Sequence, residues 1–207
     1  MATDLIISFL SAVPPDVLGA FHTRPLTLAV PSAPVGHGHT FYADYLGKFR
    51  DGKGNLIPGL FRNAGGHGAI GRVAVFGFSN GCAEGVTQLL AGNDAQKLDF
   101  VGGFDGIHGS FIKPTHLLYP PSYANWVAFG RLAAAQPPAN NGPLCVVTHS
   151  SIEPAFPSTT ETGAFLWDEV LRGALRRDAA ERYPTVRAFA LALLPFARAS
   201  ARLKWSN

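Results

Sequence analysis

Short apolar runs alternate along the chain with longer segments in which apolar and polar residues are mixed. Five of these runs are rich in β-branched or aromatic residues and are bounded by glycine, proline or polar residues, as buried strands are. They predict strands at residues 5–10, 26–30, 72–76, 100–104 and 144–148. The mixed segments predict helices near residues 16–22, 40–49, 82–91, 123–135, 159–176 and 185–203.

Alternation of strands and helices is typical of a parallel sheet covered by helices. The pattern therefore predicts a three-layer, doubly wound α/β fold with a mainly parallel sheet of about five strands and flanking helices. With 207 residues, the chain is most simply one domain spanning residues 1–207. A capping box at 158–161 marks the start of the helix at 159–176. Long loops are expected at 51–71 and 106–123, and ligands of such folds lie beyond the carboxyl ends of the strands.

One strand leads directly into a motif with chemical meaning. Residues 73–76 run into Gly77-Phe78-Ser79-Asn80-Gly81, and a helix is expected immediately afterwards. This G-x-S-x-G pattern between a strand and a helix is typical of a nucleophile elbow, a tight turn that exposes a serine hydroxyl to a base and to a substrate carbonyl. The alternative is an ordinary glycine-rich turn whose serine caps the helix.

Two further strands end in residues suited to the same chemistry. Asp105 follows the strand at 100–104, and His149 follows the strand at 144–148. Since parallel strands end at one edge of a sheet, we expect Ser79, Asp105 and His149 to form a triad in which His149 accepts the serine proton and Asp105 orients the imidazole. Alternatives stay open. Asp105 can belong to a simple turn and His149 can bond loop carbonyls, while His108 is a rival base and Glu153 a rival acid.

Acyl transfer also needs donors for the oxyanion and a surface for the substrate. The Asn80 N–H is the expected first donor, and the loop containing Gly36 and His37 is the expected source of the second. The substrate is expected to contact Phe78, His108, Phe111 and Trp126. The aromatic residues after Asp105 have a second interpretation, because they can equally pack the next helix onto the sheet.

On Gly77, Ser79 and Gly81, together with Asp105 and His149, the chain resembles the α/β-hydrolase superfamily, in particular its compact serine esterases of cutinase-like size. The resemblance covers residues 25–177 by the order of elements. It implies an α/β-hydrolase-like fold and a serine hydrolase that cleaves carboxylic esters without a cofactor.

The charge and composition of the chain limit the kinds of molecule that it is expected to bind. The net charge is only +3, and no basic stripe with interleaved aromatic residues suggests nucleic acid. His37 and His39 lack a third ligand nearby, so no metal or other cofactor is expected. No apolar segment is long enough to span a membrane. The partner expected is a small-molecule or lipid-like ester substrate, and the oligomeric state stays open.

The chain contains two cysteines, Cys82 and Cys145, and both are expected to be buried thiols outside any disulfide framework. The apolar run at 5–10 lacks the basic start and cleavage pattern of a signal peptide. The sequence therefore predicts a cytoplasmic location.

Three functions fit these residues. The first is a serine esterase, that is, a carboxylic ester hydrolase working through an acyl-enzyme on Ser79. The second is an amidase or peptidase with the same triad, because acyl chemistry does not reveal the leaving group. The third is a catalytically inactive, hydrolase-like structural or binding protein, since a fold does not guarantee an activity.

Overall fold

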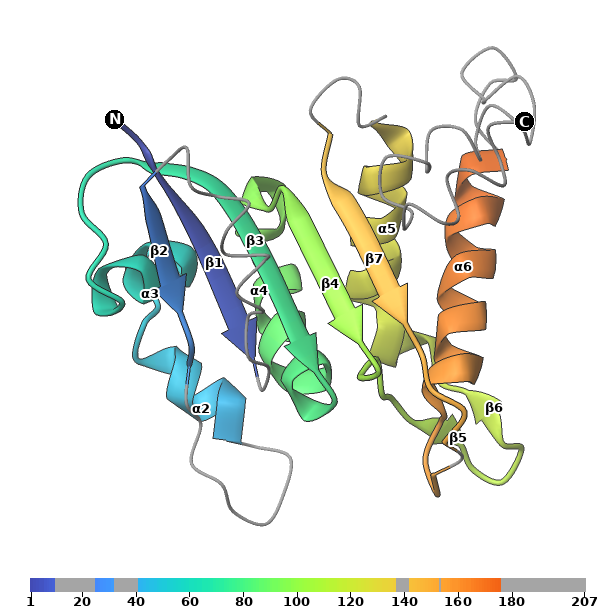
Figure 1. The fold of residues 1–207 in the computed structure, drawn as a ribbon. Coiled ribbons are helices and arrows are strands. Elements are labelled where there is room, and N and C mark those ends of the chain that lie inside the picture. Colours follow the sequence, from blue (N-terminus) through green and yellow to red (C-terminus); the bar gives the residue numbers. More distant parts are fainter. Residues whose placement is uncertain (10–24, 32–40, 137–141, 153, 176–207) are drawn as a thin grey trace.

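The computed structural model of the chain describes residues 1–9, 25–31, 41–136, 142–152 and 154–175. Among these residues, five parallel strands form one sheet in the order β2-β1-β3-β4-β7 (Figure 1). The strands are β1 (Thr3–Phe9), β2 (Leu26–Ala29), β3 (Ile70–Phe78), β4 (Phe100–Phe104) and β7 (Leu144–Thr148). An antiparallel hairpin of β5 (Phe111–Ile112) and β6 (Leu117–Leu118) follows β4.

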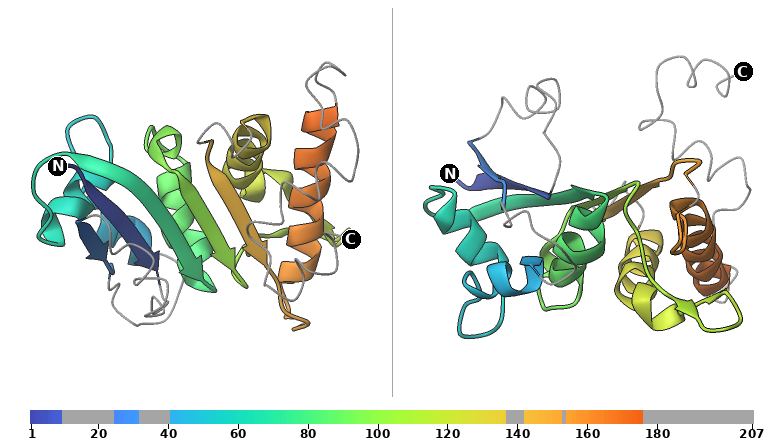
Figure 2. Two further views of the ribbon diagram at one scale, coloured as in Figure 1. Left: turned by 45° about the horizontal axis from the view of Figure 1, so that its top comes forward. Right: turned by 90° about the horizontal axis from the view of Figure 1, so that it is seen from below.

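Helices connect the strands and flank the sheet. They are α2 (Phe41–Gly47), α3 (Ile57–Asn63), the π-helix η1 (Gly81–Val86), α4 (Thr87–Leu90), α5 (Ala124–Ala135) and α6 (Thr159–Leu175), with two 3₁₀ helices, η2 (Ala95–Lys97) and η3 (Pro120–Tyr123). The right-hand view of Figure 2 shows helices α2 to α6 on one side of the sheet. Because the five strands are parallel, their carboxyl ends, marked by the arrowheads in Figure 1, share one edge of the sheet.

The sheet buries side chains on both of its faces. Ile7 and Val75 are fully buried and belong to the main apolar core, which the helices help to form. Ile6 and Phe76, which alternate with them along β1 and β3, are buried as well. Burial of both faces is usual for parallel sheets and explains their nearly continuous apolar sequences. The five-stranded parallel sheet with flanking helices confirms the predicted α/β class. Among the described residues, helices α2 to α6 form one layer against this sheet.

The predicted elements and the structure differ in a few places. All five predicted strands are present, and α5 and α6 begin within one residue of the predicted helices. The predicted helix at 82–91 is divided into η1 and α4. The loops expected at 51–71 and 106–123 contain α3 and the β5–β6 hairpin, which the sequence did not predict. The predicted helices at 16–22 and 185–203 lie outside the described residues.

Helix α6 lies beside α5 (Figure 2). The two helices approach closely at Gly130, where a Cβ atom would lie 2.6 Å from Val170 Cγ2. Arg131 on α5 also places Nη2 2.9 Å from the Glu169 Oε2 of α6. This packing fixes the position of α6, whose first residues lie near the ends of β4 and β7.

The structure also bears on the predictions about membrane-spanning segments and cysteines. In the described parts of the chain, no helix is long and apolar enough to cross a membrane. Cys82 and Cys145 are free thiols, as expected; Cys82 is buried, whereas Cys145 in β7 is half-buried.

A distant carboxylate holds the start of α3. The Asp94 side chain is buried, and its Oδ2 accepts the backbone N–H groups of Leu56, at 2.5 Å, and Ile57, at 3.4 Å. Lys97 Nζ lies 3.2 Å from the other oxygen. A carboxylate at this position satisfies N–H groups that have no acceptor within the helix and complements the helix dipole. Since the acceptor comes from a remote segment, α3 depends on tertiary structure.

We therefore expect Asp94→Ala to lower the free energy of unfolding by about 2–3 kcal/mol, because it leaves buried donors without an acceptor. Urea denaturation followed by circular dichroism measures this change. Asp44→Ala, at an exposed position in the first turn of α2, is the control and should change stability by no more than about 0.5 kcal/mol. Equal effects of the two substitutions would contradict the role given to Asp94.

Candidate active site

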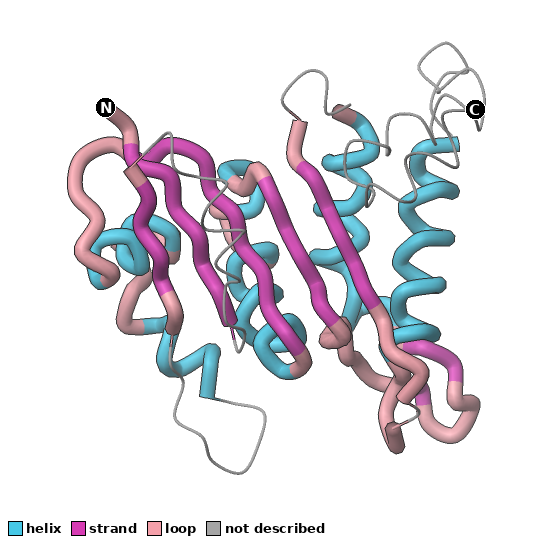
Figure 3. Tube along the Cα trace, in the orientation of Figure 1, coloured by secondary structure: helices cyan, strands magenta, loops and turns pink. Residues whose placement is uncertain are grey.

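Three of the predicted site residues follow adjacent strands at the same level of the sheet. Phe78 pairs with Phe104, and Phe104 pairs with Thr148. Ser79, Asp105 and His149 are the next residues of β3, β4 and β7, at the edge where loops emerge in Figure 3. With strands about 4.8 Å apart, Asp105 lies between the other two residues, whose backbones are separated by about 10 Å.

The ladder of hydrogen bonds continues past the strand ends. The Ser79 N–H donates to Phe104 O at 3.2 Å, and the Asp105 N–H donates to Thr148 O at 3.1 Å. The backbones of Ser79 and Asp105 are therefore held by the sheet itself.

Ser79 occupies an unusual backbone conformation. Its φ angle is +50°, in the left-handed region that costs a non-glycine residue on the order of 1–3 kcal/mol. Its carbonyl accepts the Cys82 N–H at 2.9 Å, so the chain turns at once from β3 into η1. Among the hydrogen bonds of the described residues, none involves Ser79 Oγ, and the residue at the N-cap of η1 is Asn80. These contacts do not favour the alternative in which Ser79 merely caps the helix.

The two glycines of the motif are required by close packing. A Cβ atom at Gly77 would lie 2.7 Å from the Gly81 carbonyl carbon, and one at Gly81 would lie 2.5 Å from Phe9 O. Gly106 adds a third close approach, because a Cβ atom there would lie 2.4 Å from Ser79 O. No larger side chain fits at these positions without a shift of the backbone. The turn is therefore enclosed by β1 on one side and by the loop after β4 on the other.

The helix after the turn begins as a π-helix, a feature common at functional sites. Its wider turn is closed at Thr87, whose N–H and Oγ1 both donate to Cys82 O, the latter at 3.1 Å. Trp126 Nε1 donates to Thr87 Oγ1 at 3.0 Å. Beneath the turn, burial raises the pKa of Cys82 to about 12. Cys82 therefore stays a thiol and is unsuited to nucleophilic catalysis.

Asp105 is held by several donors. Its φ angle is +46°, and its Oδ1 accepts the Ser150 N–H at 3.1 Å and the Thr159 hydroxyl at 2.5 Å. The hydrogen bond from Thr159 is the largest of the effects that lower the pKa of Asp105 below its usual value. The carboxylate is therefore ionised at neutral pH, as the acid of a triad must be.

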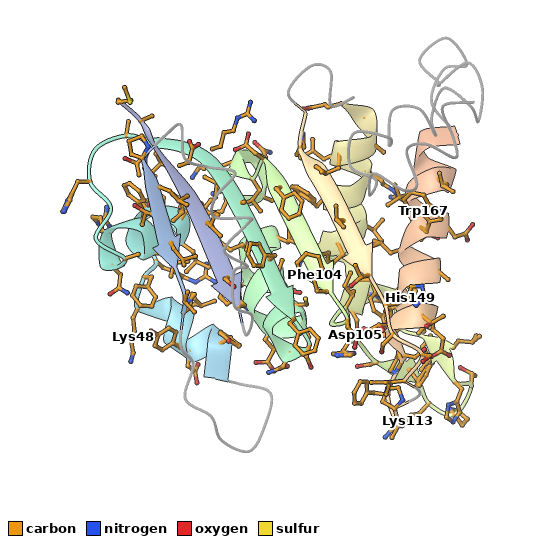
Figure 4. The ribbon with its side chains drawn as sticks, viewed as in Figure 1. Lys48, Phe104, Asp105, Lys113, His149 and Trp167 are labelled. Carbon is orange, nitrogen blue, oxygen red and sulfur yellow. The ribbon has the colours of Figure 1, made fainter. Side chains whose placement is uncertain are left out.

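His149 lies at the same edge as Asp105 but is turned toward α6 (Figure 4). The side chain is exposed, and Nδ1 lies 3.2 Å from Thr160 Oγ1. The sequence predicts that Nδ1 faces Asp105, whereas the hydrogen bonds of the Asp105 carboxylate come from Ser150 and Thr159. The structure brings the backbones of these two residues together without an imidazole–carboxylate hydrogen bond.

His108, the rival base, occupies a different environment. Its half-buried ring lies 4.8 Å from the Phe156 ring, edge to face. Nδ1 is buried and has no hydrogen-bond partner among the described residues. Burial lowers the pKa of His108, although the charge of Asp105 and a hydrogen bond with the Pro157 backbone act in the opposite direction. A neutral imidazole with a free nitrogen is suited to accept a proton.

The predicted substrate contacts divide into two groups. Phe78 is 47% exposed beside Ser79, and Phe111 is half-buried in β5, with its ring 5.2 Å from that of His116. Trp126 is only 1% exposed. Because its indole packs in the core and bonds Thr87, the structure favours the packing interpretation for Trp126, and we do not include it in the substrate site.

The predicted oxyanion donors and the rival acid are only partly within the described residues. Asn80 lies at the start of η1, where N–H groups lack intrahelical acceptors. Gly36 and His37, the expected second oxyanion donors, lie outside the described residues, as does Glu153. Within the described parts of the chain, no three His, Cys, Asp or Glu side chains gather in a way that could hold a metal ion.

Sequence reasoning missed Thr159 and Ser150, the two residues that contact the Asp105 carboxylate. The capping box was a signal for Thr159, because it correctly predicts where α6 begins. It does not show that this helix start lies against the loop after β4.

Comparisons with protein-family models, with curated proteins and with solved structures gave no match. What this chain does is therefore inferred from the geometry of its own residues.

Proposed function

We propose that the protein is a serine hydrolase that cleaves carboxylic esters through an acyl-enzyme on Ser79, as its resemblance to α/β-hydrolases implies. The observation that carries the proposal is the backbone of Ser79, which is held at a φ of +50° between β3 and η1. Strained backbone of this kind concentrates at functional sites. The close packing of Gly77, Gly81 and Gly106 around it supports the same interpretation.

In the proposed reaction, a histidine accepts the proton of Ser79 Oγ while the oxygen attacks the ester carbonyl carbon. The resulting oxyanion is stabilised by the Asn80 N–H and a second donor. The bond to the alcohol oxygen then breaks, and the histidine returns its proton to the leaving alkoxide. Water, activated by the same histidine, hydrolyses the acyl-enzyme and restores Ser79.

His149 is our proposed base, with Asp105 as the acid that orients it. Ser79, Asp105 and His149 follow the adjacent strands β3, β4 and β7 at the same level of the sheet, which supports this assignment. A serine and a histidine side chain that point toward each other can together span about two strand spacings. His149 must then turn from Thr160 toward Asp105 and Ser79. His108 stays the alternative base, favoured by its buried, unpaired Nδ1.

Apolar side chains at the same edge suit a lipid-like ester. Phe78, Leu117, Ile152 and Phe156 are 46–66% exposed on β3, on the hairpin and on the loop after β7. Together they offer apolar surface to an acyl chain, and each buried methylene contributes about 0.8 kcal/mol. We include Phe111 and His108 in this proposed substrate surface.

The cytoplasmic location stays a prediction.

We expect Ser79 to be the serine that reacts with a fluorophosphonate, because the turn exposes its hydroxyl to a base. Ser79→Ala should abolish labelling and lower kcat on p-nitrophenyl esters by on the order of 10⁴–10⁶-fold. Peptide mapping by mass spectrometry and steady-state kinetics measure the two effects.

Ser110→Ala, at an exposed serine of the loop after β4, is the matched control and should keep both labelling and turnover. Labelling of a different serine, or none in folded protein, would remove the proposal. Comparable cleavage of matched anilides would instead identify an amidase.

The base can be assigned by comparing His149→Ala with His108→Ala. We expect His149→Ala to be nearly as damaging as Ser79→Ala, because the members of a triad act as a unit. Neutral imidazole is the active form, so kcat/KM should decrease as the pH falls through the pKa of the base. Kinetics of both variants between about pH 5 and 9 provide the measurement.

A larger loss in His108→Ala would transfer the role of base to His108. The pH profile gives an independent check, because burial lowers the pKa of His108. An acid limb below about 6.5, the usual value for histidine, is therefore the profile expected with His108 as the base.

A further inference from the structure

The start of α6 is set by local hydrogen bonds. The Ser158 N–H donates to Glu161 Oε2 at 2.8 Å, and the Glu161 N–H donates to Ser158 Oγ at 3.2 Å. This is the reciprocal capping box that the sequence predicts. It makes Thr159 the first residue of the helix.

Thr159 is only 4% exposed, and its hydroxyl faces the loop after β4. Oγ1 donates to Asp105 Oδ1 at 2.5 Å. The Ser150 N–H lies 3.2 Å from the same Oγ1 and 3.1 Å from Asp105 Oδ1, and so joins the two side chains. Asp105, Ser150 and Thr159 thus form one small network that joins the loop after β4 to the segment leading from β7 into α6.

This network involves one oxygen of the carboxylate. Among the hydrogen bonds of the described residues, none involves Asp105 Oδ2. Rotation about the terminal torsion of an aspartate is broad and is not fixed by rotamer preference. The orientation of the carboxylate therefore depends on the donors at Oδ1. While they hold Oδ1, Oδ2 is available to a histidine.

We propose that Thr159 is a positioning residue for the reaction, which holds Asp105 Oδ1 so that Oδ2 is presented to the catalytic histidine. This inference rests on the proposed hydrolase function but not on which histidine is the base. Thr159 acts through Asp105 and does not touch the substrate. Helix α6 thereby becomes part of the active-site framework.

The hydroxyl also lowers the pKa of the acid. Its hydrogen bond is the largest cause of the lowered pKa of Asp105. An aspartate whose folded-state pKa is lowered is stabilised in its ionised form above that pKa, and the benefit is lost as the pH falls through it. Removing the donor should therefore raise the pKa of Asp105.

The test compares Thr159→Val, which removes the hydroxyl at nearly constant volume, with Thr159→Ser, which keeps it. We expect Thr159→Val to lower kcat on a p-nitrophenyl ester by about 10–100-fold with little change in KM, as misplacement of a catalytic group does. Thr159→Ser should restore most of the activity. In ¹³C NMR titrations, the pKa of Asp105 should increase in Thr159→Val and stay near its wild-type value in Thr159→Ser.

Thr162→Val is the matched control for a merely structural effect. Thr162 is also a buried threonine in the first turns of α6, and among the described residues its Oγ1 donates only to Thr159 O, at 3.4 Å. It should keep wild-type kcat and the wild-type pKa of Asp105. If Thr159→Val does not fold, Thr159→Ala takes its place in both measurements.

The outcomes separate this inference from the proposed function. If Ser79 is labelled and active in the wild type but Thr159→Val keeps full kcat, the positioning role is wrong and the hydrolase stands. An unchanged pKa of Asp105 in Thr159→Val also overturns the role, whether or not the protein is an enzyme. If wild-type Ser79 is inert, the hydrolase proposal fails, and the catalytic role of Thr159 fails with it.

Discussion

The left-handed backbone at Ser79 is the constraint on which the candidate site depends. A residue at a φ of +50° persists only where its surroundings over-determine it. Here the N–H of Ser79 is bound by β4, its carbonyl is bound by η1, and three glycines allow neighbouring backbone to approach within distances that exclude a Cβ atom. The turn is thus held by β1, β4 and η1 together. A flexible loop could not hold a serine in this way.

The same sheet also positions the backbone of Asp105 at this edge. Hydrogen bonds from Ser79 to Phe104 and from Asp105 to Thr148 carry the parallel ladder one step past the strands. Sites built on rigid elements hold catalytic groups more precisely than sites on loops do. Helix α6 also contacts this edge, because the hydroxyl of its first residue, Thr159, donates a hydrogen bond to Asp105. Its packing against α5 links that contact to a helix that also packs on β7.

Much of this fold follows from local sequence. The five strands, the turn at Ser79 and the capping box at Ser158 depend on residues close together in the chain, so their patterns could predict them. Helix α3 was missed because the acceptor for its first N–H groups is Asp94, which lies far along the chain. The orientation of His149 could not be predicted, because it depends on a contact with Thr160 in the next helix. For Trp126 the sequence left substrate contact and core packing open, and the contact with Thr87 that decides between them comes from a distant residue.

We propose that the turn at Ser79 positions its hydroxyl for acyl transfer. A crystal structure of the protein after reaction with a fluorophosphonate would show whether it does. We expect a phosphorus–oxygen bond to Ser79 Oγ, with the phosphonyl oxygen within about 3 Å of the Asn80 nitrogen. A histidine should lie beside Oγ, with Asp105 Oδ2 behind it. An unmodified Ser79 in an otherwise intact fold, or a phosphonyl oxygen directed away from Asn80, would contradict this role of the turn.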